Sequence, residues 1–288
     1  MRCADSRLFS TAQKIGLASA ASRLVVSCRK FLGRPPHGEF VRGGIRWQLD
    51  LREGIDFSIY LLGSFEPATV RAYRRLVKPG QTVLDIGANI GAHTLPLARL
   101  VGPTGRVIAF EPTAFAARKL IANLAINAEL APRISFHQVM LVAGKTDLLP
   151  RAVYSSWPLF AAEAVHPKHR GRLMDTAGAR AATLDELVAE MRLAEVHFVK
   201  LDVDGHEVAV LQGAGESLKR FRPLIALELA PYLHAEHGHS FDALVHLLTG
   251  AGYRLHDIAG LEPLPSDPAK LRTLVPDGRS INVFAIPA

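Results

Sequence analysis

From about residue 82 to its last residues, the chain alternates between short apolar runs and longer segments with amphipathic spacing. The runs at residues 82–86, 106–110 and 224–229 are almost continuously apolar, which is typical of strands buried on both faces of a parallel sheet. The segments between them, such as 92–101 and 112–127, place apolar side chains at helical intervals. This alternation predicts an α/β fold in which helices cover both faces of a mostly parallel sheet.

The same pattern predicts a seven-stranded sheet. The four further strands that we expect lie over residues 134–142, 196–201, 253–258 and 281–286. Thr183-Leu184-Asp185-Glu186 is a capping box that opens a helix to about Met191. A single longer helix is expected over residues 207–221, and Ser240 is expected to cap another.

The first 47 residues carry the whole net charge of the chain. They hold nine basic side chains and two acidic ones, a surplus of seven, and the chain as a whole has a net charge of +7. We therefore divide the chain into a basic N-terminal segment, residues 1–42, and an α/β domain, residues 43–288. Gly43-Gly44 and the alternating residues 45–51 predict a hairpin or an edge strand at the start of that domain.

The basic segment predicts an amphipathic helix. The side chains near one face of that helix are Leu8, Ala12, Ile15, Ser22 and Val26. A basic amphipathic helix binds anionic membrane surfaces, so one expectation is a peripheral membrane contact through residues 1–34. The alternatives are a transit-like peptide and a partly ordered leader that packs on the domain.

Composition excludes several other classes of protein. The remainder of the chain has 25 charges of each sign, so it gives no electrostatic reason to expect a nucleic acid as partner. Cys3 and Cys28 are too few for a disulfide framework or a Cys-rich zinc site. The longest apolar runs are far shorter than the ~20 residues that span a membrane. We expect a soluble, cytoplasmic protein, with the membrane contact above as its only peripheral attachment.

The first strand of the alternation ends in an unusual glycine motif. Residues 85–91 form Asp-x-Gly-x-Asn-x-Gly, in which Gly87 and Gly91 permit a tight turn and Asn89 tolerates a positive φ. Ligands of open parallel sheets bind outside the carboxyl ends of the strands. The motif differs from the Gly-x-Gly-x-x-Gly of dinucleotide-binding proteins. Asp85 would repel a pyrophosphate at this place, but it suits a cationic amino-acid ligand.

A second acidic residue ends the next strand. Glu111 follows Gly91 by twenty residues, which is where a carboxylate accepts hydrogen bonds from both hydroxyls of a ribose. An acid at each of these two strand ends predicts S-adenosylmethionine as the cofactor, bound through Asp85, Gly87, Asn89, Gly91 and Glu111.

Four motifs occur in the order seen in the FkbM-type methyltransferases, which the chain resembles over roughly residues 43–286. They are Asp85-Ile86-Gly87-Ala88-Asn89-Ile90-Gly91, Phe110-Glu111-Pro112, Thr183-Leu184-Asp185 and Lys200-Leu201-Asp202-Val203-Asp204-Gly205-His206-Glu207. The resemblance implies a class I, Rossmann-like S-adenosylmethionine-dependent fold. It also implies methyl transfer to a hydroxyl group of a sugar or small metabolite.

The resemblance adds three residues to the site. The family usually has Asp-Val-Glu-Gly-His-Glu after the fourth strand, and Asp204 stands here in place of the Glu, so a contact to the acceptor is shortened by one methylene. Glu66 matches a position that the family often fills with Glu, which implies a cofactor-side contact. Met140 lies where many class I members contact the adenine, and its thioether suits a flat ring, although core packing is an equal alternative.

The fourth-strand motif is the best candidate for the reacting centre. Asp202 ends a buried strand, and His206 lies at the start of the next helix. Methylation of oxygen needs a positioned nucleophile and a base, and an unperturbed histidine with a pKa of ~6.5 accepts a proton at physiological pH. We therefore predict His206 and Asp202 as catalytic residues. For Glu207 we expect pairing with the N-terminal end of its own helix.

Glu228 ends the fifth strand and is expected to face the same cleft, where it would contact the acceptor. Together with Asp202 it resembles the paired carboxylates that hold magnesium in catechol-type methyltransferases, but we expect no metal here. The run from His234 to His239 is a second possible metal cluster, for which we favour a solvated loop because it has no clear ligand spacing.

Residues 149–182 interrupt the alternation with several aromatic and basic side chains, including Trp157, Lys168 and His169. Long insertions of this kind often act as lids, so we expect Trp157 to stack on a sugar or other small acceptor. The alternative is a surface excursion with Trp157 packed into the domain.

Two other functions stay open at this point. A nicotinamide-dependent oxidoreductase shares the Rossmann-like fold and an acid at the second strand, although the glycine spacing disagrees. The other alternative is a module that binds the cofactor and has lost catalysis.

Overall fold

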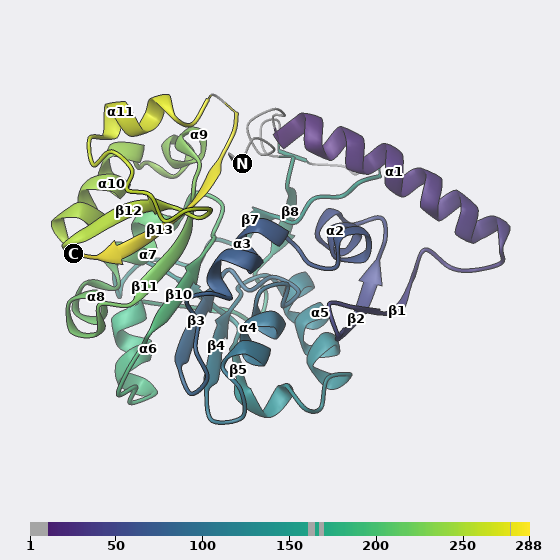
Figure 1. Ribbon diagram of the computed structural model, residues 1–288, viewed down its shortest axis with the longest axis horizontal. Helices are drawn as coiled ribbons and strands as arrows, with labels where there is room; N and C mark the ends of the chain where they lie inside the picture. Colours follow the sequence, from purple (N-terminus) through teal and green to yellow (C-terminus); the bar gives the residue numbers. More distant parts are fainter. Residues whose placement is uncertain (1–10, 161–164, 167–169, 277) are drawn as a thin grey trace.

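The computed structural model describes residues 11–160, 165–166, 170–276 and 278–288, and its centre is a seven-stranded sheet (Figure 1). All neighbouring strands are parallel except β13, which runs antiparallel to both β11 and β12. This confirms the expected sheet. The strands in spatial order are β12 (Tyr253–Asp257), β13 (Ile281–Pro287), β11 (Leu224–Leu229), β10 (Phe198–Leu201), β3 (Thr82–Ile86), β4 (Arg106–Phe110) and β5 (Ile134–His137).

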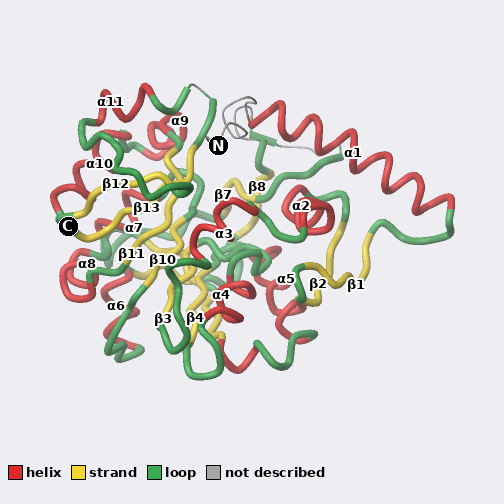
Figure 2. Tube along the Cα trace, in the orientation of Figure 1, coloured by secondary structure: helices red, strands yellow, loops and turns green. Residues whose placement is uncertain are grey.

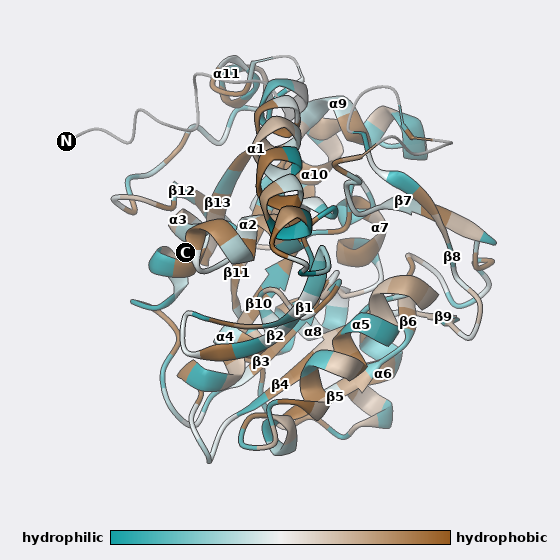
Figure 3. Cartoon of the chain, turned by 90° about the vertical axis from the view of Figure 1, so that its right-hand side faces the viewer, coloured by the Kyte–Doolittle hydropathy of each residue, from teal (hydrophilic) through white to brown (hydrophobic). Residues whose placement is uncertain are grey.

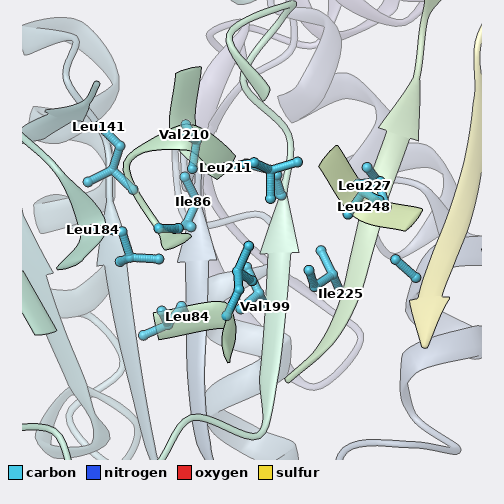
Figure 4. Packing of buried hydrophobic residues seen from close by; sticks show 14 of the residues in the cluster. Leu84, Ile86, Leu141, Leu184, Val199, Val210, Leu211, Ile225, Leu227 and Leu248 are labelled. Atoms are coloured by element: carbon cyan, nitrogen blue, oxygen red, sulfur yellow. The ribbon is translucent and has the colours of Figure 1, made fainter. Parts of the chain in front are cut away.

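One face of the sheet is covered by helices from the second half of the chain. These are α6 (Leu184–Glu190), α7 (Glu207–Gln212), α8 (Gly215–Phe221) and α10 (Phe241–Gly250). Alternate strand residues such as Leu84, Val199 and Ile225 point into this layer (Figure 4). Leu184, Leu211 and Leu248 meet them from the helices.

The opposite face is covered by helices from the first half. These are α2 (Gly54–Leu62), α3 (Pro67–Tyr73), α4 (Thr94–Leu100) and α5 (Ala114–Ala125). Here Val83, Phe198 and Phe284 of the sheet pack against Tyr73 and Leu95. The two apolar layers explain why the strands are apolar on both sides.

The N-terminal segment is folded onto this second layer. Helix α1 (Thr11–Phe31) packs along α2, and a hairpin of β1 (His37–Arg42) and β2 (Ile45–Asp50) follows it (Figure 2). The expected domain boundary after residue 42 therefore falls inside a hairpin. No helix in the described part of the chain is long and apolar enough to cross a membrane.

The inward face of α1 contains residues that we had expected to face a membrane. Ile15 and Val26 pack against the core, and the fully buried hydroxyl of Ser22 donates a hydrogen bond to the carbonyl of Leu51. This face of the segment therefore packs on the domain and does not face a membrane. Leu8 lies outside the described residues.

Two expected elements are each divided in the structure. Residues 134–142 form β5 and a separate β6 (Val139–Leu141), which leaves the main sheet to pair with β9 (Arg180–Ala182). Residues 207–221 form α7 and α8, with Gly213 at the break. A Cβ added to Gly213 would be 2.1 Å from the carbonyl oxygen of Val142, so only glycine fits there. Asp185 then accepts hydrogen bonds from the first backbone amides of α8.

The insertion at 149–182 contains a hairpin of β7 (Ala152–Ser155) and β8 (Arg172–Asp175). Lys168 and His169 lie outside the described residues. The remaining helices are α9 (Pro231–His234), α11 (Pro268–Thr273) and two 3-10 turns, Ala131–Arg133 and Ala235–His237.

Candidate active site

A cleft of about 590 Å³, open to solvent, lies at the carboxyl ends of β3, β4 and β10. This is where an open parallel sheet binds its ligands, beside the point at which the strand order reverses. The residues predicted from the sequence that line it are Gly87, Asn89, Glu111, Met140, Asp202, Asp204 and His206. Tyr154 and Ser155 of β7 also line it, so the inserted hairpin forms one wall.

The glycine turn after β3 forms the floor of the cleft. Gly87 has a φ of 83°, and a Cβ built on it would be 1.8 Å from the carbonyl oxygen of Asp202, so no other residue fits there. Asn89 has a φ of 47°, as its residue type predicted. Its side-chain amide lies 3.3 Å from the hydroxyl oxygens of both Ser155 and Ser156, and it thereby joins the turn to the hairpin.

Glu111 is held rigidly at the end of β4. One of its oxygens accepts hydrogen bonds from the backbone N–H and the hydroxyl of Thr113, at 2.8 and 2.6 Å, and the other accepts one from the N–H of Asn89 at 3.0 Å. The side chain is buried, and burial raises its pKa despite these hydrogen bonds. Each oxygen of a carboxylate has two lone pairs, so acceptor capacity is left on the Asn89 side.

His206 lines the same cleft, as do the apolar side chains of Met140, Val203 and Val210. Burial lowers its pKa to about 4, and the neighbouring His237 and His239 add to this effect. His206 is therefore neutral at physiological pH. It can accept a proton, but it is a weaker base than the unperturbed histidine that we had expected.

The histidines after β11 support the fourth-strand turn, so the expected solvated loop was wrong. His234 is fully buried with its Nδ1 3.4 Å from the carbonyl oxygen of Gly205, and His237 lies with its ring centroid 3.8 Å from that of His206. Nε2 of His237 lies 3.2 Å from the carbonyl oxygen of Asp204. These residues fix the backbone that carries Asp204 and His206.

Glu207 also has a structural position. It is buried, and one carboxylate oxygen accepts hydrogen bonds from the backbone amides of Val203 and Gly205 at 3.1 and 3.4 Å. Its other oxygen lies 3.7 Å from Nδ1 of His234. The expected pairing with the start of its helix is thus a pairing with the turn just before that helix.

A buried polar layer lies beside the cleft on the α3–α4 face of the sheet. Side chains alternate between the two faces of a strand, so residues two positions apart lie on the same face. Asp85, Lys200 and Asn282 therefore share the face of Val83, Phe198 and Phe284. The members of this layer are Asp85 of β3, Lys200 of β10, Asp202 just after β10, Glu228 of β11 and Asn282 of β13. Glu66 and His93 reach the layer from the ends of α3 and α4.

Lys200 is the central cation of this layer. Its side chain is 1% exposed, and Nζ donates a hydrogen bond to Asp202 at 2.9 Å. Burial alone would lower its pKa, but the carboxylates of Asp202, Glu66 and Asp85 outweigh burial and raise it. Lys200 is a charged residue in an otherwise apolar strand, and this feature of the sequence could have predicted a buried polar layer.

Glu66 completes the layer at its outer side. One of its oxygens accepts a hydrogen bond from Asn282 at 2.9 Å, and the other lies 3.5 Å from Nε2 of His93. Burial would raise its pKa, but His93 and Lys200 lower it to about 2. Glu66 Oε2, His93 Nε2 and Asn282 Oδ1 are buried without a hydrogen-bond partner among the described residues.

Asp85, Glu66 and Glu228 lie in this layer and do not line the cleft itself. Asp85 accepts a hydrogen bond from the hydroxyl of Thr94 at 2.5 Å, and burial raises its pKa. Burial and the carboxylates of Asp202 and Glu66 raise the pKa of Glu228 well above its ordinary value. Gly91 faces Leu120 of α5, so it serves the turn and its packing.

Trp157 also lies away from the cleft. Its ring centroid is 5.8 Å from that of Phe65, and its backbone carbonyl accepts a hydrogen bond from Gly54 at the start of α2. The structure thus favours the alternative in which Trp157 packs into the domain. Tyr154 takes the wall position that we had expected for Trp157.

The polar layer does not fit a magnesium ion. Asp202 already pairs with the ammonium group of Lys200, which occupies the position of a cation between the carboxylates. Within the ranges that the structure describes, no group of three or more His, Cys, Asp or Glu side chains is arranged to hold a metal ion.

The family model for the methyltransferase FkbM domain matches residues 85–255, which is more than half of the chain. The chain belongs to the FkbM methyltransferase family. Its strand order, with the antiparallel β13 between β11 and β12, is that of the class I S-adenosylmethionine-dependent methyltransferases. An oxidoreductase is not favoured by this assignment.

Solved structures with similar folds include two methyltransferases and a fibrillarin. The precorrin-6y C5,15-methyltransferase of Geobacter metallireducens GS-15 is 13% identical, with a TM-score of 0.43 over 78% of this chain and 89% of that one. The methyltransferase FkbM of Methylobacillus flagellatus KT is 17% identical, with a TM-score of 0.42 over 81% of this chain and 56% of that one. Aeropyrum pernix fibrillarin, solved with natively bound S-adenosyl-L-methionine, is 13% identical, with a TM-score of 0.44 over 87% and 82%. None of the curated proteins matches the chain.

The residues of this FkbM-family protein fit the cofactor that the family implies. S-adenosylmethionine carries an ammonium and a sulfonium group, and the polar layer beside the cleft holds more carboxylates than cations. Glu66 Oε2 is buried in that layer without a hydrogen-bond partner among the described side chains, 3.5 Å from Nε2 of His93, so the layer retains acceptor capacity. Gly87 keeps the floor of the cleft free of side-chain atoms.

Proposed function

We propose that this FkbM-family protein transfers a methyl group from S-adenosylmethionine to a hydroxyl oxygen of a sugar or another small metabolite. The observation that carries the proposal is the pair of polar side chains that line the cleft after β10, namely Asp202 and His206. A hydroxyl oxygen that gains a methyl group must lose its proton, so an oxygen acceptor requires such groups nearby.

The cofactor side of the proposal uses the glycine turn and the end of β4. Glu111 would accept hydrogen bonds from the ribose hydroxyls, because its carboxylate retains acceptor capacity and its position is fixed by Thr113 and Asn89. Gly87, Asn89 and Gly91 would shape the turn, and Met140 would contact the adenine. Glu66 and Asp85 would face the cationic groups. When bound, the cofactor supplies an electrophilic methyl group.

The acceptor side uses the fourth-strand turn. We assign to His206 the role of accepting the hydroxyl proton, and to Asp202, held by Lys200, that of orienting the hydroxyl group. Asp204 would contact another hydroxyl group of the acceptor, and β7 would cover it. Burial and the neighbouring carboxylates of Asp202 and Glu207 raise the pKa of Asp204 well above its ordinary value. A protonated Asp204 would donate a hydrogen bond as well as accept one.

Radiolabelled methyl transfer tests this function. The purified protein is incubated with S-adenosylmethionine labelled in its methyl group and with small-molecule fractions of the source cells, and the labelled product is identified. We expect the label on oxygen. His206→Ala should lower turnover ~10²–10⁴-fold and leave cofactor affinity nearly unchanged, because His206 acts on the acceptor. His246→Ala is the matched control, since His246 is exposed on α10 and does not line the cleft.

Three results would contradict parts of the proposal. Label on nitrogen or carbon would overturn the oxygen acceptor. Full turnover of His206→Ala would remove its role as the base. Tight binding of the cofactor without transfer to any fraction would favour the alternative of a catalytically inactive binding module.

A further inference from the structure

The outward face of α1 exposes large apolar side chains in a line. Leu17, Leu24 and Phe31 are 59%, 67% and 91% exposed, and they follow one another at intervals of seven residues, which is two helical turns. Leu32, directly after the helix, is 65% exposed. Three large side chains thus lie about 10 Å apart along one line of one helix, here called the apolar edge, whereas isolated surface leucines are common.

The inward face of α1 holds this edge in a fixed orientation. Ser22 is fully buried and bonds to Leu51, while Ile15 and Val26 pack against the core. Near the end of the helix, the guanidinium of Arg29 lies 5.1 Å from the ring centroid of Phe40 in β1. The apolar edge therefore points outward because the opposite face is bound to the domain.

Basic side chains flank the apolar edge. Lys14 lies on one side of it, Arg23 and Lys30 on the other, and Arg34 follows the helix, all of them exposed. Residues 11–31 include no Asp or Glu. Figure 3, which looks onto this flank of the molecule, shows α1 in front of the domain with hydrophobic and hydrophilic segments interspersed along it.

The neighbouring elements add further apolar surface. Val41 of β1 and Leu61 and Leu62 of α2 are between 58% and 60% exposed. Helix α2 contacts both α1 and β1, so these side chains belong to the same flank of the molecule (Figure 1).

We propose that α1 docks this protein onto an anionic lipid bilayer, with Leu17, Leu24 and Phe31 at the boundary between headgroups and acyl chains. A helix with an apolar edge and basic flanks lies in such an interface and is attracted by anionic lipids. A second copy of the chain is the other occupant to consider. In a dimer through this face, the positively charged side chains of the two copies would lie close together and repel each other. Charge complementarity therefore favours the anionic lipid.

This inference does not depend on the proposed methyl transfer. The docking face lies on α1, and none of its residues lines the cleft. Lipid binding is measured without cofactor or acceptor, so failure of one proposal is distinguishable from failure of the other. Docking would bring the cleft to acceptors at or near a membrane.

Co-sedimentation of the full-length protein with vesicles tests the proposal. One set of vesicles contains phosphatidylcholine alone, and the other contains phosphatidylcholine with about 30% phosphatidylserine. We expect binding to the anionic vesicles, at least tenfold stronger than to the neutral ones and weakened by salt. The triple variant Leu17→Gln, Leu24→Gln and Phe31→Gln should lose at least tenfold in affinity at an unchanged melting temperature, because these side chains are exposed.

Leu148→Gln is the matched control, since Leu148 is 89% exposed and lies elsewhere on the surface. A second readout uses the exposed Cys28 of α1. In a Cys3→Ser protein, an environment-sensitive fluorophore is attached to Cys28. Its emission maximum should shift to shorter wavelength when anionic vesicles are added.

Several results would overturn the proposal. These are equal binding to neutral and anionic vesicles, no binding to either, or unchanged binding of the triple variant. A dimer in sedimentation equilibrium that the triple variant dissociates, with no vesicle binding, would show that the second copy covers this face.

Discussion

At the scale of single residues, Glu207 makes the stability of the fold depend on pH. Burial raises its pKa to about 7 from an ordinary value of 4.5. The folded protein therefore binds a proton between these two pH values that the unfolded chain has released, so this residue lowers stability as pH rises from about 4.5 to about 7. Relative to Glu207→Gln, the wild-type free energy of unfolding should fall by about 3 kcal/mol across that range. Thermal or urea unfolding at a series of pH values measures this difference.

Glu129→Gln, at an exposed carboxylate, is the control and should follow the wild-type pH profile. In Glu207→Gln, the carbonyl oxygen of the new side-chain amide can keep the hydrogen bonds from Val203 and Gly205, so the variant should fold. Parallel pH profiles for wild type and Glu207→Gln would show that Glu207 has no raised pKa.

At the scale of elements, the contact between the glycine turn and the β7–β8 hairpin decides how firmly the cleft wall is held. The Asn89 amide lies within hydrogen-bond distance of Ser155 and Ser156, and each such hydrogen bond contributes about 1 kcal/mol. In the double variant Ser155→Ala and Ser156→Ala, the amides of β7 and β8 should exchange with deuterium roughly tenfold faster. The amides of β3 and β4 should be unaffected. Exchange followed by mass spectrometry measures both sets.

Ser135→Ala, at an exposed serine of β5, controls for the loss of a hydroxyl group alone. If β7 and β8 exchange at the wild-type rate in the double variant, the hairpin is held by its apolar contacts and not by Asn89.

At the scale of the whole molecule, α1 and the sheet domain form one folded unit. Ser22 is completely buried where α1 meets the chain after β2, and a carboxylate there would be desolvated without a partner. Ser22→Glu should therefore detach α1, lower the melting temperature by several degrees and open the segment around residues 32–36 to protease. Thermal unfolding and limited proteolysis test this outcome.

Ser27→Glu offers the matched control, because Ser27 is exposed on the other side of the same helix. Equal melting temperatures and equal digestion of the two variants would mean that α1 is attached only loosely to the domain.

Several features of this protein were determined by the sequence alone. The apolar runs predicted the strands of the sheet, since a strand buried on both faces needs apolar side chains at every position. The motif at residues 85–91 predicted its turn, because the conformations of Gly87 and Asn89 depend on their own residue types. Glu111, Asp202 and His206 could be placed at one edge of the sheet, because parallel strands bring their carboxyl ends together.

Other features were decided by contacts between residues far apart in the sequence. The carbonyl of Val142 leaves room only for a glycine at the break between α7 and α8, and β6 lies outside the main sheet because it pairs with β9. Burial lowers the pKa of His206, and His237 and His239 from another segment add to this effect. Lys200 is charged inside a strand because carboxylates from three segments surround it. Local patterns determine which elements form and how each one turns. The free energies of burial, pairing and ionisation depend on the neighbours that each residue meets only in the folded chain.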